Sequence, residues 1–204
     1  MPSVLIVDYG MSNLASIKRA LEICGAEPTV SDKPSMLGNT DKIILPGVGS
    51  FDEGMKNLRD KGLDKAIKDA CKKGASLLGI CLGMQLLAGS GSEGEGSEGL
   101  DLIHGSVAKM IPKSRNDRVP HVGWNNVAYS NENQLFKDIP KSVDFYFVHS
   151  YHFVPTDNRA VLATTPHCGT IVSAINEGNI FGIQFHPEKS SNHGLQLLNN
   201  FINL

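Results

Sequence analysis

Short, mainly apolar runs alternate with amphipathic stretches along the first half of the chain. The runs have the length and composition of strands buried on both faces, and they span residues 4–7, 29–30, 42–45 and 76–80. Apolar residues at helical spacing predict helices over about residues 13–24 and 63–73. Strands that alternate with helices form right-handed βαβ units, so we expect a mostly parallel central sheet with flanking helices.

Beyond residue 100 the pattern changes to predominantly strand-like segments. These segments span residues 119–127, 143–149, 160–165, 170–175 and 180–185. A closing amphipathic helix is predicted over residues 194–204. No linker separates the two halves, so we expect a single α/β domain over residues 1–204 with an additional β-rich portion in its C-terminal half.

The composition is that of an ordinary globular protein, with 204 residues, 41% of them hydrophobic and 20% charged. A formal net charge of −2 gives no electrostatic reason to bind nucleic acid or a membrane. Four widely spaced cysteines form no C-x-x-C pair, and His149 and His152 lack a third ligand, so neither a metal site nor a disulfide framework is expected. No signal peptide or membrane-spanning run is recognisable, and a cytoplasmic location fits best.

A nucleophile stands where the run at residues 76–80 ends. Cys81 is flanked two residues away by Gly79 and Gly83, and helix-forming residues follow, which matches the strand–turn–helix elbow G-x-Nuc-x-G. Such a turn holds its nucleophile in a strained backbone conformation, and a Cβ at either glycine would collide with a neighbouring strand or helix. The following helix N-terminus favours a negatively charged sulfur. A buried structural cysteine on a βα turn is the alternative.

A histidine and a carboxylate follow the strand predicted at residues 180–185. Pro187 pushes His186 into an extended conformation, and residues two apart in an extended segment project to the same side. His186 and Glu188 can therefore place an imidazole beside a carboxylate that orients it. Together with Cys81 they form a candidate catalytic triad, because reactive groups of parallel sheets gather at the carboxyl ends of strands.

A glycine-rich turn after residues 42–45 is the candidate for part of an oxyanion hole. Acyl transfer needs two N–H donors aimed at the developing negative oxygen. The amide of Leu82 is one expected donor, and a peptide of the Val48 and Gly49 segment is the other. Glycines on both sides of Val48 would let this peptide reorient, so we expect the hole to be completed only when a partner is docked. Gln85, one helical turn after Cys81, faces the same pocket.

Two motifs together resemble the class I, triad-type glutamine amidotransferases: GICLGMQ at residues 79–85 and QFHPE at residues 184–188. Four further motifs are similar to those of the glutaminase subunits of imidazole glycerol phosphate synthase, namely DYG at 8–10, PGVGSF at 46–51, PHVGWN at 120–125 and YFVHSY at 146–151. The resemblance covers nearly the whole chain. It implies the flavodoxin-like fold of the family, and no cofactor.

The resemblance also implies an activity and a partner. Members hydrolyse glutamine to glutamate and ammonia through a thioester, and the ammonia passes to a cyclase subunit in a heterodimer. That subunit converts the precursor PRFAR to imidazole glycerol phosphate and AICAR in histidine biosynthesis. G-x-G-x-x-G occurs at residues 89–94 and 94–99, but this segment follows a predicted helix and carries three glutamates, so no phosphate site is expected there. This agrees with the second reaction residing on another protein.

Further site residues follow from the resemblance alone. Expected contacts of the bound glutamine are Gly49, Gln85, Glu93, Ser150 and Tyr151. Expected contacts of the synthase partner are Asn13, Trp124, Tyr146 and Lys189. Glu93 lies in a segment at residues 89–99 that otherwise has the composition of a mobile surface loop, and core packing is the alternative role for Trp124.

Other classes of protein share part of these patterns. A cysteine peptidase or other thiol hydrolase could use the same triad, although Gln85, Ser150 and Tyr151 favour glutamine. A non-catalytic docking subunit would not need an intact triad. Within the family, paralogues that feed ammonia to a sugar amidotransferase remain an alternative, because residues 11–13 and 191–192 depart from the usual glycine-bearing sequences near the expected docking face.

Overall fold

The computed structural model describes residues 1–94, 96–115, 117–129 and 133–204. Its strands are β1 (Ser3–Val7), β2 (Glu27–Ser31), β3 (Lys42–Gly47), β4 (Ser76–Cys81), β5 (Ser90–Gly91), β6 (Ser97–Glu98), β7 (Gly105–Lys109), β8 (His121–Tyr129), β9 (Val143–His149), β10 (Tyr151–Pro155), β11 (Val161–Pro166), β12 (Thr170–Glu177) and β13 (Ile180–Ile183). Its α-helices are α1 (Leu14–Ile23), α2 (Phe51–Asp60), α3 (Leu63–Lys72), α4 (Leu82–Leu86) and α5 (Ser191–Ile202). Short 3₁₀ turns are η1 (Pro34–Asn39), η2 (Gln134–Phe136), η3 (Asn158–Ala160) and η4 (Pro187–Lys189).

Nine strands of the described ranges form one large sheet, in the order β2-β1-β3-β4-β13-β12-β11-β8-β9. The strands from β2 to β13 pair in parallel, and those from β13 to β9 pair antiparallel. The predicted α/β fold with its β-rich second half is confirmed, and the sheet is mixed. β13 belongs to both parts, because one of its edges pairs in parallel with β4 and the other pairs antiparallel with β12.

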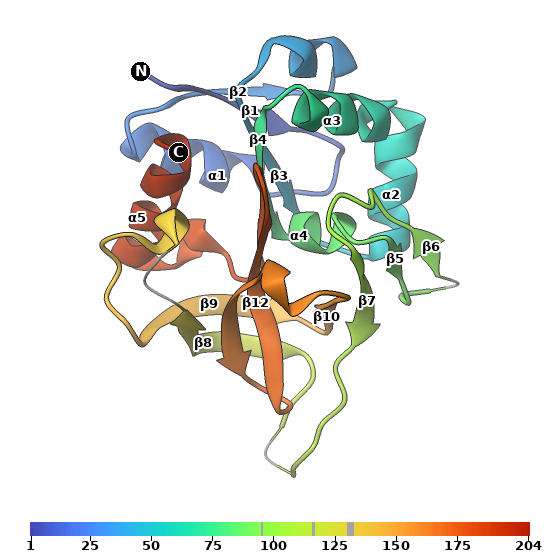
Figure 1. Ribbon diagram of the computed structural model, residues 1–204, viewed down its shortest axis with the longest axis vertical. Helices are drawn as coiled ribbons and strands as arrows, with labels where there is room; N and C mark the ends of the chain where they lie inside the picture. Colours follow the sequence, from blue (N-terminus) through green and yellow to red (C-terminus); the bar gives the residue numbers. More distant parts are fainter. Residues whose placement is uncertain (95, 116, 130–132) are drawn as a thin grey trace.

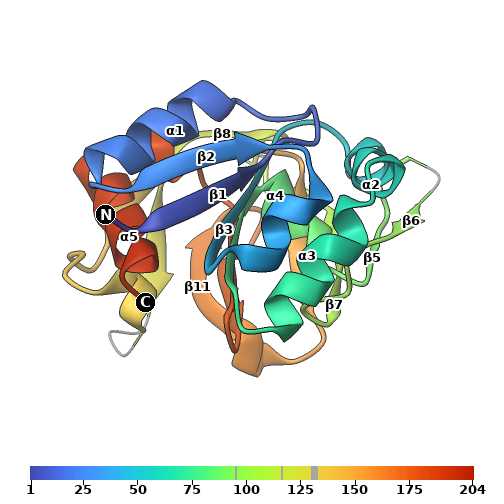
Figure 2. The same cartoon turned by 90° about the horizontal axis from the view of Figure 1, so that it is seen from above.

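Helices cover both faces of the parallel part (Figures 1 and 2). Alternate residues of β1 point to opposite faces, as in any strand. Val4 and Ile6 lie in the core that α1 and α5 cover, whereas Leu5 and Val7 lie in the core covered by α2, α3 and α4. Both faces of β1 are therefore apolar, which explains its uninterrupted hydrophobic run. Within the described ranges, no helix is both long and apolar enough to span a membrane.

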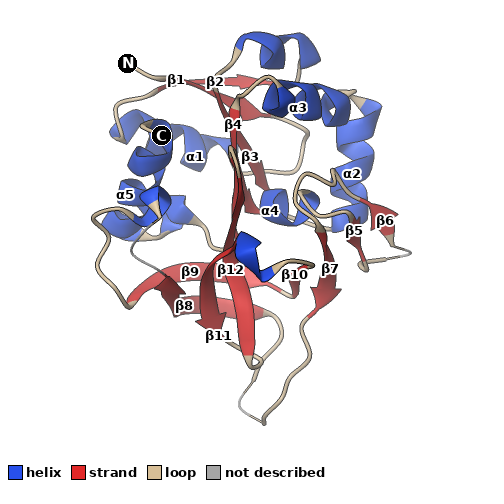
Figure 3. Ribbon diagram, viewed as in Figure 1, coloured by secondary structure: helices blue, strands red, loops and turns tan. Residues whose placement is uncertain are grey.

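The predicted strands of the large sheet agree with the structure to within two residues at each end, and α5 begins three residues earlier than predicted. Five helices and strands were not predicted, namely α2, β5, β6, β7 and β10. The strands β7 and β10 join β5 and β6 in a second, four-stranded sheet beside α2 (Figure 3). The segment predicted as a surface loop thus contributes two short strands, and residue 95 within it lies outside the described residues.

Candidate active site

β4 and α4 meet at a sharp turn that carries the Cys81 side chain. Cys81 has φ of 55° and ψ of −109°, a conformation that residues with a Cβ rarely adopt. A Cβ on Gly79 would lie 2.6 Å from the carbonyl oxygen of Gly83, and a Cβ on Gly83 would overlap the carbonyl oxygen of Leu45 in β3. The predicted steric requirement for both glycines is confirmed. Close packing of backbone on backbone therefore holds the strained turn in place.

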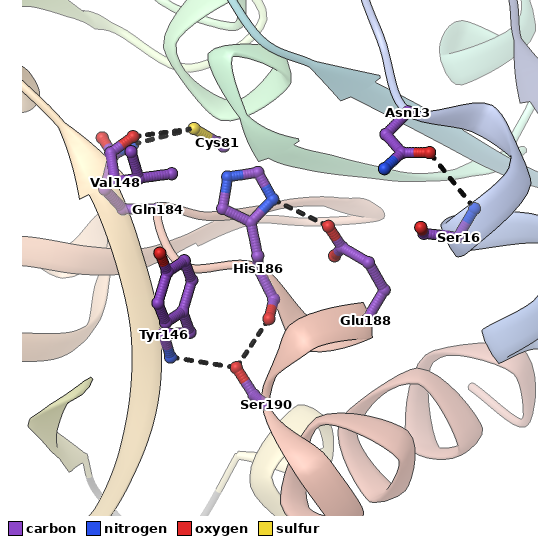
Figure 4. Close-up of polar contacts among 9 residues, drawn as sticks. All are labelled: Asn13, Ser16, Cys81, Tyr146, Val148, Gln184, His186, Glu188 and Ser190. Atoms are coloured by element: carbon purple, nitrogen blue, oxygen red, sulfur yellow. Dashed lines mark hydrogen bonds and ion pairs between the residues drawn. The ribbon is translucent and has the colours of Figure 1, made fainter. Parts of the chain in front are cut away.

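The imidazole and the carboxylate follow β13 as a buried pair. His186 Nδ1 lies 2.8 Å from Glu188 Oε1, and their side chains are only 4% and 3% exposed. The backbone N–H of His186 donates to the Tyr146 carbonyl of β9, and the Ser190 hydroxyl donates to the His186 carbonyl. These bonds fix the loop that carries the pair, and Glu188 fixes the ring (Figure 4).

Cys81 lies next to this imidazole but does not hydrogen-bond to it. The sulfur contacts the Val148 carbonyl oxygen at 4.0 Å and Gln184 Nε2 at 3.8 Å, while His186 Nε2 has no hydrogen-bond partner among the described residues (Figure 4). Burial by itself lowers the pKa of His186, but its interactions with Cys81 and Glu188 outweigh burial and raise the pKa to about 10. The sulfur and the Glu188 carboxylate therefore both stabilise the charged ring, in a resting geometry that a rotation of the Cys81 side chain would tighten.

A cavity of about 290 Å³ opens on the sulfur. Its lining residues are Val48, Gly49, Cys81, Leu82, Gln85, Glu93, Val148, His149, Ser150 and Tyr151. All residues expected to contact glutamine or to form the oxyanion hole are therefore brought together with the candidate nucleophile. The volume suits a ligand of the size of one amino acid.

The two candidate peptides of the oxyanion hole differ in their hydrogen bonds. The N–H of Val48 donates to the carbonyl oxygen of Met11 at 2.8 Å. The N–H of Gly49 has no acceptor among the described residues, and Gly49 has φ of 115°, where glycine is strongly favoured. Leu82 is the first residue of α4, so its N–H has no partner within the helix. The Gly49 and Leu82 amides are therefore the available donors.

Gln184 is a polar contact of the sulfur that the sequence patterns did not predict as part of the site. Gln85 Nε2 donates to the Tyr151 carbonyl at 3.0 Å and to Gln184 Oε1 at 3.1 Å, which turns the Gln184 amide N–H groups toward Cys81. Gln184 is fully buried between two apolar neighbours in sequence. The sequence did contain a signal for Gln184, because it is a polar residue in a predicted strand of otherwise apolar or small residues, and a buried amide needs hydrogen-bond partners.

Glu93 is held at the cavity by the helix that the sequence patterns missed. Its Oε2 accepts a hydrogen bond of 2.8 Å from the backbone N–H of Phe51, the first residue of α2. The partial positive charge of a helix N-terminus stabilises a carboxylate at this position. Gly91 also packs on the Phe51 ring, where a Cβ would lie 2.5 Å away. α2 thus orders the segment that carries Glu93.

The residues expected to contact a partner form an exposed surface near the cavity. Trp124 on β8 and Tyr146 on β9 are directly opposite each other, with ring centroids 6.1 Å apart, and Lys189 Nζ lies 5.7 Å from the Tyr146 ring centroid. Trp124 is 52% exposed, so the core-packing alternative is wrong. Asn13 caps α1 by accepting a hydrogen bond from the Ser16 N–H and lies in a depression shared with Lys189.

Comparisons with known proteins match nearly the whole chain. The family model described as class-I glutamine amidotransferase matches residues 5–204. The chain is 46% identical over 201 residues to the imidazole glycerol phosphate synthase subunit HisH of Moorella thermoacetica, covering 98% of this chain and 94% of the relative. It is 45% identical over 199 residues to the protein of the same name from Chlorobaculum tepidum, covering 97% and 98% of the two chains.

Solved structures share the fold at lower sequence identity. The structure of PurLQS from Thermotoga maritima has a TM-score of 0.76 at 23% identity, and the match covers 99% of this chain and 98% of the other. A glutamine amidotransferase of known structure has a TM-score of 0.75 at 18% identity, with coverage of 98% and 99%. These likenesses show the fold.

Proposed function

This chain belongs to the class I glutamine amidotransferases, and we propose that it is the glutaminase subunit of an imidazole glycerol phosphate synthase. One observation carries the proposal. A single cavity joins Cys81 to all the residues expected to hold glutamine, and the His186–Glu188 pair lies beside the sulfur. The relatives named HisH, at about 45% identity over nearly the full length, support the choice of synthase.

The reaction starts with the sulfur of Cys81, which attacks the side-chain amide carbon of glutamine. His186 takes the thiol proton and delivers it to the leaving nitrogen, so that the carbon–nitrogen bond breaks, ammonia leaves and a thioester remains. The Gly49 and Leu82 amides hold the negative oxygen, and Glu188 keeps the imidazole oriented. His186 then deprotonates a water molecule, which attacks the thioester, and glutamate and the free thiol are released.

The proposed partner is the cyclase subunit, which would receive the ammonia in a cytoplasmic heterodimer. The exposed Trp124 ring, the half-buried Tyr146 ring and Lys189 are the docking face, because large aromatic side chains and neighbouring cations commonly supply the energy of such interfaces. Glu188 and Lys189 are adjacent in the chain, so this face begins next to the triad.

The experiment that tests the function is a glutaminase assay of the purified chain. We expect release of glutamate and ammonia from glutamine, stimulated by the cyclase subunit together with its ligand. Cleavage of peptides at rates that the cyclase does not change would contradict the proposal and favour a thiol hydrolase. Stimulation by a sugar amidotransferase synthase in place of the cyclase would favour the paralogous function.

Replacing Gly49 with alanine is expected to lower glutamine turnover by about a hundredfold, the effect of losing one oxyanion donor. Alanine disfavours the φ of 115°, and its Cβ would lie 2.5 Å from Met11 Cε, so the peptide would turn away from the cavity. Gly25→Ala is the control, because Gly25 has φ of 80° with nothing within 4 Å of an added Cβ. Unchanged turnover in Gly49→Ala would refute the assignment.

Replacing Trp124 with alanine is expected to weaken binding of the cyclase subunit by at least about tenfold, since buried aromatic anchors dominate interface energies. Titration calorimetry or surface plasmon resonance measures the change in Kd. Ile23→Ala is the matched control, because Ile23 is 61% exposed at the far end of α1. Equal affinity of the Trp124→Ala variant and the wild type would place the docking face elsewhere.

A further inference from the structure

A series of side-chain hydrogen bonds leads from β8 to the wall of the cavity. Asn125 Nδ2 lies 3.0 Å from His121 Nε2, His121 Nδ1 lies 3.0 Å from His149 Nε2, and His149 Nδ1 lies 2.7 Å from the carbonyl oxygen of Tyr151. His121 and His149 are buried and stand directly opposite each other on β8 and β9. None of these three side chains takes part in the chemistry proposed above.

Backbone groups at both ends of this series determine which atom donates and which accepts in each hydrogen bond. A carbonyl oxygen only accepts, so His149 Nδ1 must carry a hydrogen. At the other end, Asn125 Nδ2 also lies 3.1 Å from the Pro166 carbonyl, and Asn125 Oδ1 accepts from the N–H of Asn126 at 2.8 Å. These two partners determine which amide atom is nitrogen. Asn125 therefore donates to His121 Nε2.

The number of ring protons follows from these two ends. His121 Nε2 accepts a hydrogen bond, so it carries a lone pair and no proton. One proton lies between His121 Nδ1 and His149 Nε2, and a second proton lies on His149 Nδ1. Two protons on two rings leave both imidazoles neutral. If an acceptor replaced the Asn125 amide, the same three contacts would need three ring protons, and one ring would become positive.

The surroundings favour neutral rings. His121 is stacked between Phe147, with centroids 4.6 Å apart, and His167, with centroids 3.9 Å apart. Burial and the neighbouring His167 lower the pKa of His121 to about 4, and burial is the main reason why the pKa of His149 is lowered to about 3. In the part of the chain that the structure describes, no group of three ligands could hold a metal here.

We propose that Asn125, His121 and His149 are positioning residues, which hold the carbonyl of Tyr151 and thereby the glutamine-binding wall. The same carbonyl accepts the Gln85 Nε2 hydrogen at 3.0 Å, so it is held from two sides. Ser150 and Tyr151 line the cavity next to it. The proposal rests on the proposed function, since the position of this wall matters only if glutamine binds there.

The first test determines the protonation state and tautomer of the two rings by ¹⁵N NMR of the histidine side chains at neutral pH. In the wild type we expect two neutral rings, each protonated at Nδ1. In Asn125→Asp we expect one of the two to become an imidazolium, because the carboxylate accepts where the amide donated. Asn126→Asp, which adds the same charge on the opposite side of β8, should leave both rings neutral. A wild-type ring that is positive or protonated at Nε2 would overturn the proposal, even if the aspartate variant failed to fold.

The second test separates KM from kcat for glutamine in the assembly with saturating cyclase subunit. Asn125→Asp is expected to raise KM about tenfold, equivalent to about 1.4 kcal/mol, and to change kcat by less than about threefold. Asn126→Asp should change neither. An unchanged KM in Asn125→Asp would overturn the positioning role. A wild type that does not hydrolyse glutamine would instead overturn the proposed function and leave the NMR result intact.

Discussion

Glutamine hydrolysis is expected to fall by at least about 10⁴-fold when Cys81 is replaced with alanine, as when a triad nucleophile is removed from other enzymes. The elbow aims this sulfur into the cavity that holds every predicted glutamine contact. No thioester can form without this sulfur. Hydrogen bonds from Gln184 or from the oxyanion donors cannot replace that covalent intermediate. A discontinuous assay of glutamate release, sensitive to slow turnover, measures the loss.

Cys71→Ala is the matched control for this variant. Cys71 is a buried cysteine of α3, and burial raises its pKa to about 11, so its thiol stays un-ionised and unreactive. Activity within a few-fold of the wild type is expected. The Cys81→Ala variant should also show a lower pKa of His186 by NMR titration, because one of the two groups that raise this pKa is lost. Substantial residual activity, or an unchanged His186 titration, would contradict the assigned pair.

Gly83→Ala is expected to destabilise the fold by about 3 kcal/mol or more, lowering Tm by roughly 6–12 °C in a chain of this size. The added Cβ would overlap the Leu45 carbonyl oxygen, and backbone in a central strand cannot move aside as a flexible side chain can. α4 would have to shift away from β3, which would also displace Cys81. Thermal unfolding followed by circular dichroism measures the effect.

Gly38→Ala separates this clash from the general effect of replacing a glycine. Gly38 lies in η1, with nothing within 4 Å of an added Cβ, so its replacement should change stability by less than about 1 kcal/mol. If Gly83→Ala unfolded at the same temperature as Gly38→Ala, the packing of the elbow against β3 would not be what holds the turn.

Much of the molecule could be predicted from short-range patterns. Strands buried on both faces are mainly apolar, and the residues of the Cys81 elbow and of the His186–Glu188 segment have local stereochemical requirements. The carboxyl ends of parallel strands meet at one edge of the sheet, so distant triad members could be placed together before the structure was known. These inferences need only neighbouring residues and one general rule of topology.

The parts that could not be predicted depend on partners far away in the chain. The apolar stripe of α2 is interrupted by Gly54 and surrounded by charges, so its pattern is weak until Phe51 and Met55 are seen against the core. Glu93 is positioned by its hydrogen bond with the Phe51 N–H, and Gln184 is oriented by its hydrogen bond with the Gln85 side chain. Likewise, the contact between the Val48 amide and the Met11 carbonyl depends on how two loops meet.

The reversal of strand direction at β13 has a mechanical consequence for the cavity. Cys81 ends a strand of the parallel part, whereas Ser150 and Tyr151 follow β9 at the outer edge of the antiparallel part. The two walls of the cavity therefore belong to different parts of the sheet, with β13, β12, β11 and β8 between the strands that carry them. We therefore expect a partner that shifts β8 and β9 to move Ser150 and Tyr151 relative to the sulfur, while the backbone packing of Gly79 and Gly83 keeps the Cys81 turn unchanged.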